Sequence, residues 1–224
     1  MCGRFTVRTA PRVKLPGIRK TDLLFEPRYN IAPSQEIWAV GDFGNGLEFT
    51  KLVWGLIPAW SADNKGFINA RSETLEDKPS FSESFQKRRC LIPADGFYEW
   101  KRSGRTKQAF LFELIDELPF AFAGIWDRWG TREPITSCAI ITTNANKIVE
   151  QLHDRMPVIL KPESYEEWLD PNADLASLKR LLSPLPASEM ICHPVSSAVN
   201  YVDNEGPQLV ERVDHEIGTT PSLF

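Results

Sequence analysis

The chain has 224 residues and a mass of 25.4 kDa, which is enough for one sizeable domain with a hydrophobic core. It is 42% hydrophobic and 25% charged, as is typical of a soluble globular protein. No apolar run approaches the ~20 residues of a membrane-spanning helix, and the N-terminus lacks the apolar stretch of a signal peptide, so we expect an intracellular protein with a single domain over residues 1–224.

The formal net charge is −4, but the charges are unevenly distributed. Residues 1–20 contain six Lys and Arg and no acid, and residues 87–107 contain seven against two acids. Residues 150–224 show the reverse, with five basic and thirteen acidic residues. If the two basic segments fold together, they form a cationic patch suited to nucleic acid, although such runs are more often ordinary solvated faces.

The cysteines and histidines do not have the spacing of a disulfide framework or a metal site. Neither a CxxC nor an HExxH pattern occurs among Cys2, Cys90, Cys138, Cys192, His153, His193 and His215. We therefore expect reduced thiols, no metal and no cofactor.

Apolar alternation predicts strands, in chain order, at 36–40, 47–54, 97–101, 109–115, 120–126, 137–142 and 190–195. The segment 103–106 predicts a hairpin turn. Helix signals are fewer: a capping box at Ser80 and Glu83, a short helix from Asn144 to about Leu152, a helix over 165–169 after Pro162, and a last helix over 174–182. This order predicts an α+β fold around a mainly antiparallel sheet.

Short polar motifs interrupt this pattern at 1–5 (MCGRF), 28–33 (RYNIAP), 54–60 (WGLIPAW), 69–74 (NARSET), 93–100 (PADGFYEW), 153–157 (HDRMP) and 193–196 (HPVS). Together, in this order, they resemble the SRAP (SOS response-associated peptidase-like) family from Met1 to about Leu209. The resemblance implies a single α+β domain with a mainly antiparallel, barrel-like β core, peripheral helices and a cleft for DNA. It also implies a sensor of abasic sites in single-stranded DNA, whose N-terminal cysteine joins covalently to the ring-opened sugar aldehyde.

Cys2 has a chemistry that fits this implied function. A residue this small allows an aminopeptidase to remove Met1, which leaves an amine and a thiol on adjacent carbons. The amine condenses with an aldehyde to an imine, and the thiolate adds to the same carbon to close a thiazolidine. From its position alone, the alternative is that Cys2 packs as a small apolar residue.

Three further residues are candidates for the reaction. An abasic sugar is mostly a closed hemiacetal, so its opening needs groups that move protons. Glu99, on a strand of aromatic residues, and His153 are the predicted proton carriers, and the amide of Asn69 is predicted to hold the sugar oxygen or the amine. Their alternatives are a strand carboxylate, a core or surface histidine and a turn asparagine.

The predicted DNA contacts are three arginines and three apolar residues: Arg4, Arg71, Arg155, Pro33, Trp54 and Trp60. A guanidinium suits phosphate oxygens and reads no sequence, whereas a structural salt bridge is the alternative for each arginine. The apolar residues come from turn-rich segments and are predicted to stack or wedge against bases.

Three functions therefore remain open. The first is a lyase-like crosslinking of Cys2 to abasic single-stranded DNA. The second is a cysteine peptidase in which His153 activates Cys2, acting on peptides or only on its own Met1, and the third is a non-catalytic single-strand binding module. For the first we expect a monomer, cytoplasmic and nucleoid-associated in a bacterium or nuclear in a eukaryote.

Overall fold

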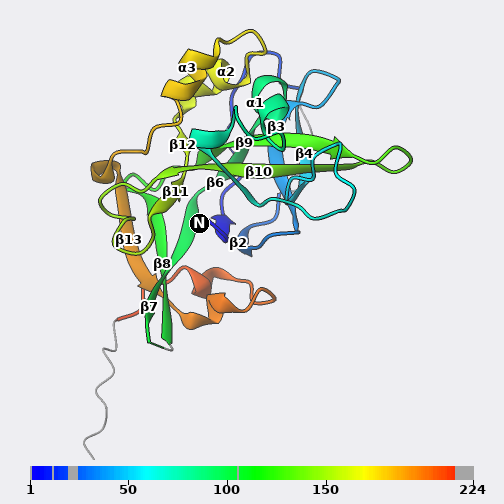
Figure 1. The fold of residues 1–224 in the computed structure, drawn as a ribbon. Helices are drawn as coiled ribbons and strands as arrows, with labels where there is room; N and C mark the ends of the chain where they lie inside the picture. The colour runs from blue at the N-terminus through cyan, green and yellow to red at the C-terminus, as the bar shows by residue number, and fades with distance from the viewer. Residues whose placement is uncertain (1, 12, 20–24, 105, 215–224) are drawn as a thin grey trace, which may run out of the picture.

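The computed structural model describes residues 2–11, 13–19, 25–104 and 106–214 (Figure 1). Its centre is a closed barrel of β3 (Glu36–Asp42), β4 (Leu47–Trp54), β6 (Arg89–Ala94), β9 (Phe120–Trp129) and β10 (Ile135–Asn144). The barrel closes because β10 pairs with β9 over one stretch and with the end of β4 over a shorter one. All its pairings are antiparallel except that of β10 with β4.

Shorter strands extend this barrel along β10 and β9. They are β5 (Asn69–Arg71), β11 (Arg155–Pro157) and β12 (Ile159–Leu160). Thr142 of β10 is paired with β5 on one side and with β11 on the other. Strand β10 therefore brings the 69–74 and 153–157 motifs together.

A second sheet lies beside the barrel and contains the N-terminal segment (Figure 1). Its order is β13 (Met190–Val195), β8 (Thr106–Leu114), β7 (Gly96–Ser103), β1 (Phe5–Val7) and β2 (Arg28–Ile31), and every pairing is antiparallel. The first strand is thus held between β2 and β7.

The helices α1 (Ser82–Lys87), α2 (Tyr165–Leu169) and α3 (Leu175–Arg180) gather on one side of the barrel (Figure 1). They cover the outer cluster of buried apolar residues, which includes Phe85, Trp168 and Leu178. The buried guanidinium of Arg89 donates to carbonyl oxygens at the end of α1 and after α2, which ties both helices to the start of β6. Short 3₁₀ helices lie at Ser72–Thr74, Pro162–Ser164, Ala187–Glu189, Ser197–Asn200 and Pro207–Leu209.

The predicted fold class, with its antiparallel barrel-like core and peripheral helices, is confirmed. Each predicted strand is present, and most extend by a few residues, while the 103–106 turn joins β7 to β8. The shortest strands and the uniformly buried β6 were not predicted, because a strand with no alternation gives no periodic signal.

Two helix predictions were wrong. Helix α1 begins after Phe81 without a side-chain cap, so Ser80 and Glu83 form no capping box. Asn144 ends β10, and Asn146 instead accepts from the amides of Ile148 and Val149 in a run of turns. Asp174 does cap α3, by accepting from the Ser177 amide at 3.0 Å. Across the described residues, no helix is long and apolar enough to cross a membrane.

Candidate functional site

Cys2 is fully buried where the two sheets meet. The chain around it runs along β7, because Tyr98 donates its amide to the Arg4 carbonyl at 3.0 Å and Phe5 pairs with Phe97. From the barrel side, the Asn69 side-chain amide donates to the Cys2 carbonyl at 2.9 Å. The two motifs 1–5 and 69–74 therefore share one site.

Glu99 of β7 contributes a carboxylate to the same region and is almost fully buried. Burial and the nearby negative charge of Glu99 raise the pKa of the Cys2 thiol well above its ordinary value. In the folded chain the sulfur is therefore a neutral thiol. The Asn69 oxygen Oδ1 is also buried and accepts no hydrogen bond from the part of the chain that the structure describes.

His153 precedes β11, and its side chain is 31% exposed. Its Nδ1 accepts from the Arg155 amide at 2.9 Å and lies 2.8 Å from an Asp154 carboxylate oxygen. Since Nδ1 uses its lone pair on the amide, the neutral ring carries its proton on Nε2. In this tautomer Nε2 is a hydrogen-bond donor, and Nε2 can take a proton only in the other tautomer, whose Nδ1–H donates to the Asp154 carboxylate.

Arg4 lies at the mouth of the site and is held in place by protein acceptors. Its Nη1 donates to Asn30 Oδ1 at 2.6 Å and to the Val199 carbonyl at 2.9 Å, and its guanidinium lies 6.0 Å from the centre of the Trp100 ring. Beside it is a cavity of about 340 Å³ that Lys107 also lines. Asn30 and Trp100 were not selected from the sequence, although both belong to the motifs.

The other two predicted arginines differ. Arg71 ends β5 and is exposed. Arg155 is buried and donates to both Glu73 oxygens, at 2.5 and 2.9 Å, and to the Asn144 side chain and the Thr142 carbonyl. For Arg155, the salt-bridge alternative describes the structure.

The three apolar candidates differ in how far they are buried. Trp54 is 0% exposed, packs on Phe5 with a ring-centre distance of 5.1 Å and donates to the Ile68 carbonyl, so the prediction that it stacks on a base is corrected: it is a core residue. Pro33 is partly exposed, next to the turn at Ser34. Trp60, in contrast, is 66% exposed.

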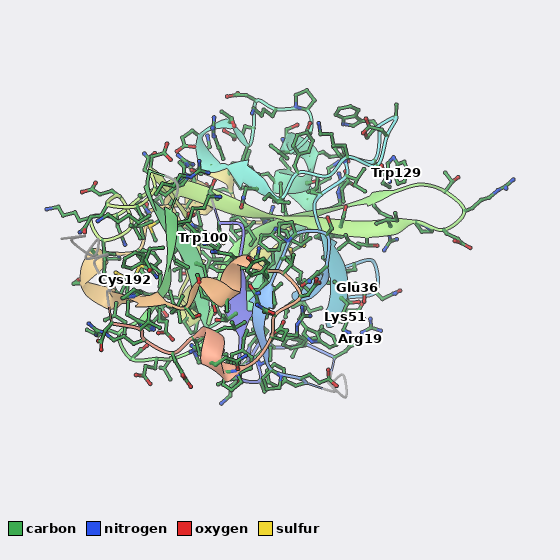
Figure 2. The ribbon with its side chains drawn as sticks, turned by 90° about the horizontal axis from the view of Figure 1, so that it is seen from below. Arg19, Glu36, Lys51, Trp100, Trp129 and Cys192 are labelled. Atoms are coloured by element: carbon green, nitrogen blue, oxygen red, sulfur yellow. The ribbon has the colours of Figure 1, made fainter. Side chains whose placement is uncertain are left out.

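The barrel holds the loop that carries Trp60 through hydrogen bonds to the residues before and after it. The Ala59 amide donates to Asp127 at 2.9 Å, and the Trp129 indole donates to the Ser61 carbonyl at 2.8 Å. Figure 2 shows Trp129 on the outer part of the projecting β9–β10 hairpin, away from Trp100. Trp60 is therefore an exposed ring on a fixed backbone.

The two basic segments meet where β1 pairs with β7, but much of their charge is neutralised internally. Arg8 is paired with Asp95 at 3.0 Å and with Glu113 at 2.6 Å. The exposed cations that remain on the β7–β8 hairpin include Lys101, Arg102 and Lys107. No three His, Cys, Asp or Glu side chains converge as a metal site within the described ranges.

The Cys2 environment predicts its reactivity in the full-length chain. Because a raised pKa keeps the thiol protonated, we expect slow alkylation of Cys2 by iodoacetamide at pH values where an exposed thiol ionises, about 8.5. The half-buried Cys192 should react first, and all four cysteines should react alike in urea. Peptide mapping by mass spectrometry measures this, and alkylation of folded Cys2 as fast as Cys192 would contradict it.

The comparisons with known proteins agree with one another. The family described as "SOS response associated peptidase (SRAP)" matches residues 1–202. The chain is 45% identical over 222 residues to "Abasic site processing protein YoqW" of Bacillus subtilis, covering 94% of this chain and 99% of that protein. It is 31% identical to "Abasic site processing protein YedK" of Escherichia coli, covering 95% and 100%.

Solved structures share the fold. A Bacteroides thetaiotaomicron protein matches with a TM-score of 0.73 and 31% identity, over 80% of this chain and 82% of that one. A phage-related protein of Bordetella bronchiseptica matches with the same TM-score and identity, over 88% of this chain and 95% of that one.

Proposed function

Because this chain belongs to the SRAP family, we propose that it processes abasic sites in single-stranded DNA, by forming a thiazolidine crosslink through Cys2 once Met1 has been removed. The single observation that carries the proposal is the setting of Cys2, which is buried beside Glu99 and held at its carbonyl by Asn69. The relatives are named as abasic site processing proteins, which supports an abasic site as the substrate.

The proposed reaction balances without a cofactor. The α-amine of Cys2 attacks the sugar aldehyde, and loss of one water gives an imine. The thiol then adds to the imine carbon, its sulfur forms the new bond, and its proton ends on the nitrogen. Burial keeps the thiol protonated, so its proton must leave as the sulfur bonds to the imine carbon.

The other candidate side chains take the remaining roles. Glu99 moves the proton that opens the closed sugar, and His153 exchanges protons through Nε2 in the tautomer whose Nδ1–H donates to Asp154. The Oδ1 of Asn69, which accepts no hydrogen bond from the described residues, accepts from the sugar hydroxyl or from the amine. Arg4 and Arg71 contact phosphates, and Trp60 with Pro33 meets the bases.

A cysteine peptidase remains the second candidate. Like the crosslinking reaction, it needs the sulfur of Cys2 to attack as a thiolate, so the raised pKa of the thiol applies to both candidates. A peptidase would also cleave peptides without an aldehyde, which separates the two experimentally.

The first prediction of the proposed function concerns the crosslink. The processed protein should form a denaturant-resistant adduct with an oligonucleotide that carries one abasic site, measured on a denaturing gel and mapped by mass spectrometry. Cys2→Ala should lose the thiazolidine and leave at most a reducible imine, while Cys192→Ala should react normally. A chain that keeps Met1 should form none, because its α-nitrogen is an amide. An adduct mapped to Cys90, Cys138 or Cys192 would refute the mechanism.

The second prediction separates catalysis from binding. Glu99→Gln should slow both formation and reversal of the adduct by about 10²–10⁴-fold, as expected for loss of a general acid–base, while noncovalent affinity is nearly unchanged. The equilibrium yield should not move, because both directions slow together. Wild-type rates in this variant would remove Glu99 from the mechanism.

The third prediction uses the contrast between the two arginines near β10. Arg71→Ala should weaken binding to all strand sequences alike. It should also lower the slope of the log binding constant against log salt concentration by about 0.7, since one phosphate contact is lost. Arg155→Ala should mainly lower stability, because it leaves Glu73 without its partner. Arg19→Ala, which removes an ion pair with Glu48, is the control and should leave the slope unchanged. A base-dependent loss in Arg71→Ala would show that this arginine reads sequence.

A further inference from the structure

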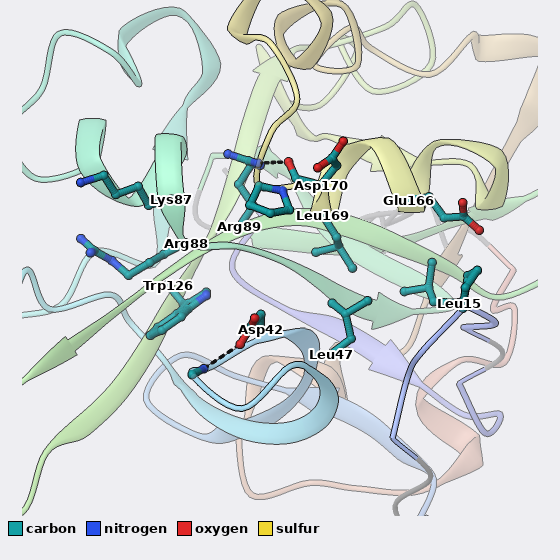
Figure 3. Close-up of a pocket in the computed structure, with 13 residues that line it drawn as sticks. Leu15, Asp42, Leu47, Lys87, Arg88, Arg89, Trp126, Glu166, Leu169 and Asp170 are labelled. Carbon is teal, nitrogen blue, oxygen red and sulfur yellow. Dashed lines mark hydrogen bonds between the residues drawn. The ribbon is translucent and has the colours of Figure 1, made fainter.

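A cavity of about 490 Å³ lies at the other end of β6 from the Cys2 site (Figure 3). Strand β6 begins in this cavity at Arg89 and ends at Ala94, after which the chain turns into β7 and reaches Glu99. At ~3.3 Å per residue, β6 alone spans roughly 16 Å. The cavity is therefore separate from the candidate active site.

The walls of the cavity are mainly apolar. Leu15, Leu47, Leu169 and Trp126 line it, from the N-terminal segment, the β3–β4 hairpin, α2 and β9. Its volume falls in the range of about 300–1,000 Å³ that is typical of small-molecule sites, which combine apolar walls with a few polar groups.

One of those polar groups is the indole N–H of Trp126. The side chain is only 7% exposed, and its nitrogen finds no acceptor within the part of the chain that the structure describes. The ring itself is fixed by Phe43, with ring centres 5.0 Å apart, and by the Arg128 guanidinium at 5.9 Å. Figure 3 shows the nitrogen edge of Trp126 turned toward the cavity. Because buried donors normally have acceptors, this one points to a ligand that supplies an acceptor.

Asp42 provides an acceptor next to this donor. It adjoins Phe43, which packs on Trp126, and Figure 3 shows both side chains at the same wall. Its Oδ1 already accepts hydrogen bonds from the amides of Gly44 and Gly46, at 2.8 and 3.0 Å. Its Oδ2 is thus suited to accept from a donor on the ligand.

The charges of the wall favour a neutral ligand. The basic residues Lys87, Arg88 and Arg89 are matched in number by the acidic residues Asp42, Glu166 and Asp170. The two arginines also have internal partners: Arg88 pairs with Glu83 and Asp127, and Arg89 donates to backbone carbonyls.

We propose that this cavity is a second binding site, for a small neutral heteroaromatic molecule with an acceptor and a donor side by side on one edge. A cyclic amide or a nucleobase has this chemistry. The acceptor receives the Trp126 N–H, the donor bonds to Asp42, and the ring lies against Leu47 and Leu169.

The test follows the Trp126 indole N–H signal by ¹H–¹⁵N NMR of the full chain. The probes are 2-pyridone, N-methyl-2-pyridone, which has no donor, and benzoate, which is an anion. We expect 2-pyridone to shift the Trp126 signal saturably and to bind better than both other probes. An unmoved Trp126 signal, or benzoate binding as well as 2-pyridone, would overturn the proposal.

Variants supply the matched controls. Trp126→Phe keeps an aromatic ring and should weaken the affinity for 2-pyridone about fivefold, as expected for the loss of one hydrogen bond. Trp38→Phe should leave this affinity unchanged. Leu47→Trp, which fills the cavity, should abolish the shift of the Trp126 signal. Equal binding of 2-pyridone to wild type and to Leu47→Trp would place the probe elsewhere and refute the site. The NMR readout on the wild-type chain decides the proposal even if Trp126→Phe does not fold.

Discussion

The pairing of β1 with β7 is the interaction on which the rest of the site depends. It holds the N-terminal segment inside a sheet, so that Cys2 becomes a buried residue at the junction with the barrel. A terminus is normally among the least ordered parts of a domain unless a strand ties it down. Here the tie also sets the position of Arg4, whose carbonyl receives the Tyr98 amide.

The same pairing explains the protonation of the thiol. Strand β7 carries Glu99 to Cys2, and burial combined with this carboxylate raises the pKa of the sulfur. The thiolate is the attacking form of a cysteine, so either candidate reaction of Cys2 requires a base that takes this proton.

Much of the positive charge of the chain is used to build the fold. Arg8 joins Asp95 and Glu113, Arg89 ties two helices to β6, and Arg155 joins Glu73 to β10. Each of these guanidiniums satisfies buried acceptors that would otherwise be costly. The cations available to a partner are those at the surface. The net charge counted along a segment therefore overstates the charge that the segment presents to a partner.

The fold class and most strands of the two sheets can be predicted from the sequence, because alternation and turn residues are local signals. Its motifs also selected Cys2, Asn69 and Glu99 as candidates, and the structure places these three residues together. The folded arrangement alone shows that Trp54 is a core residue and Trp60 an exposed one, since burial depends on what packs against a side chain. It likewise shows that Arg155 faces a carboxylate while Arg71 faces solvent, because an arginine's partner is set by strands distant in the chain.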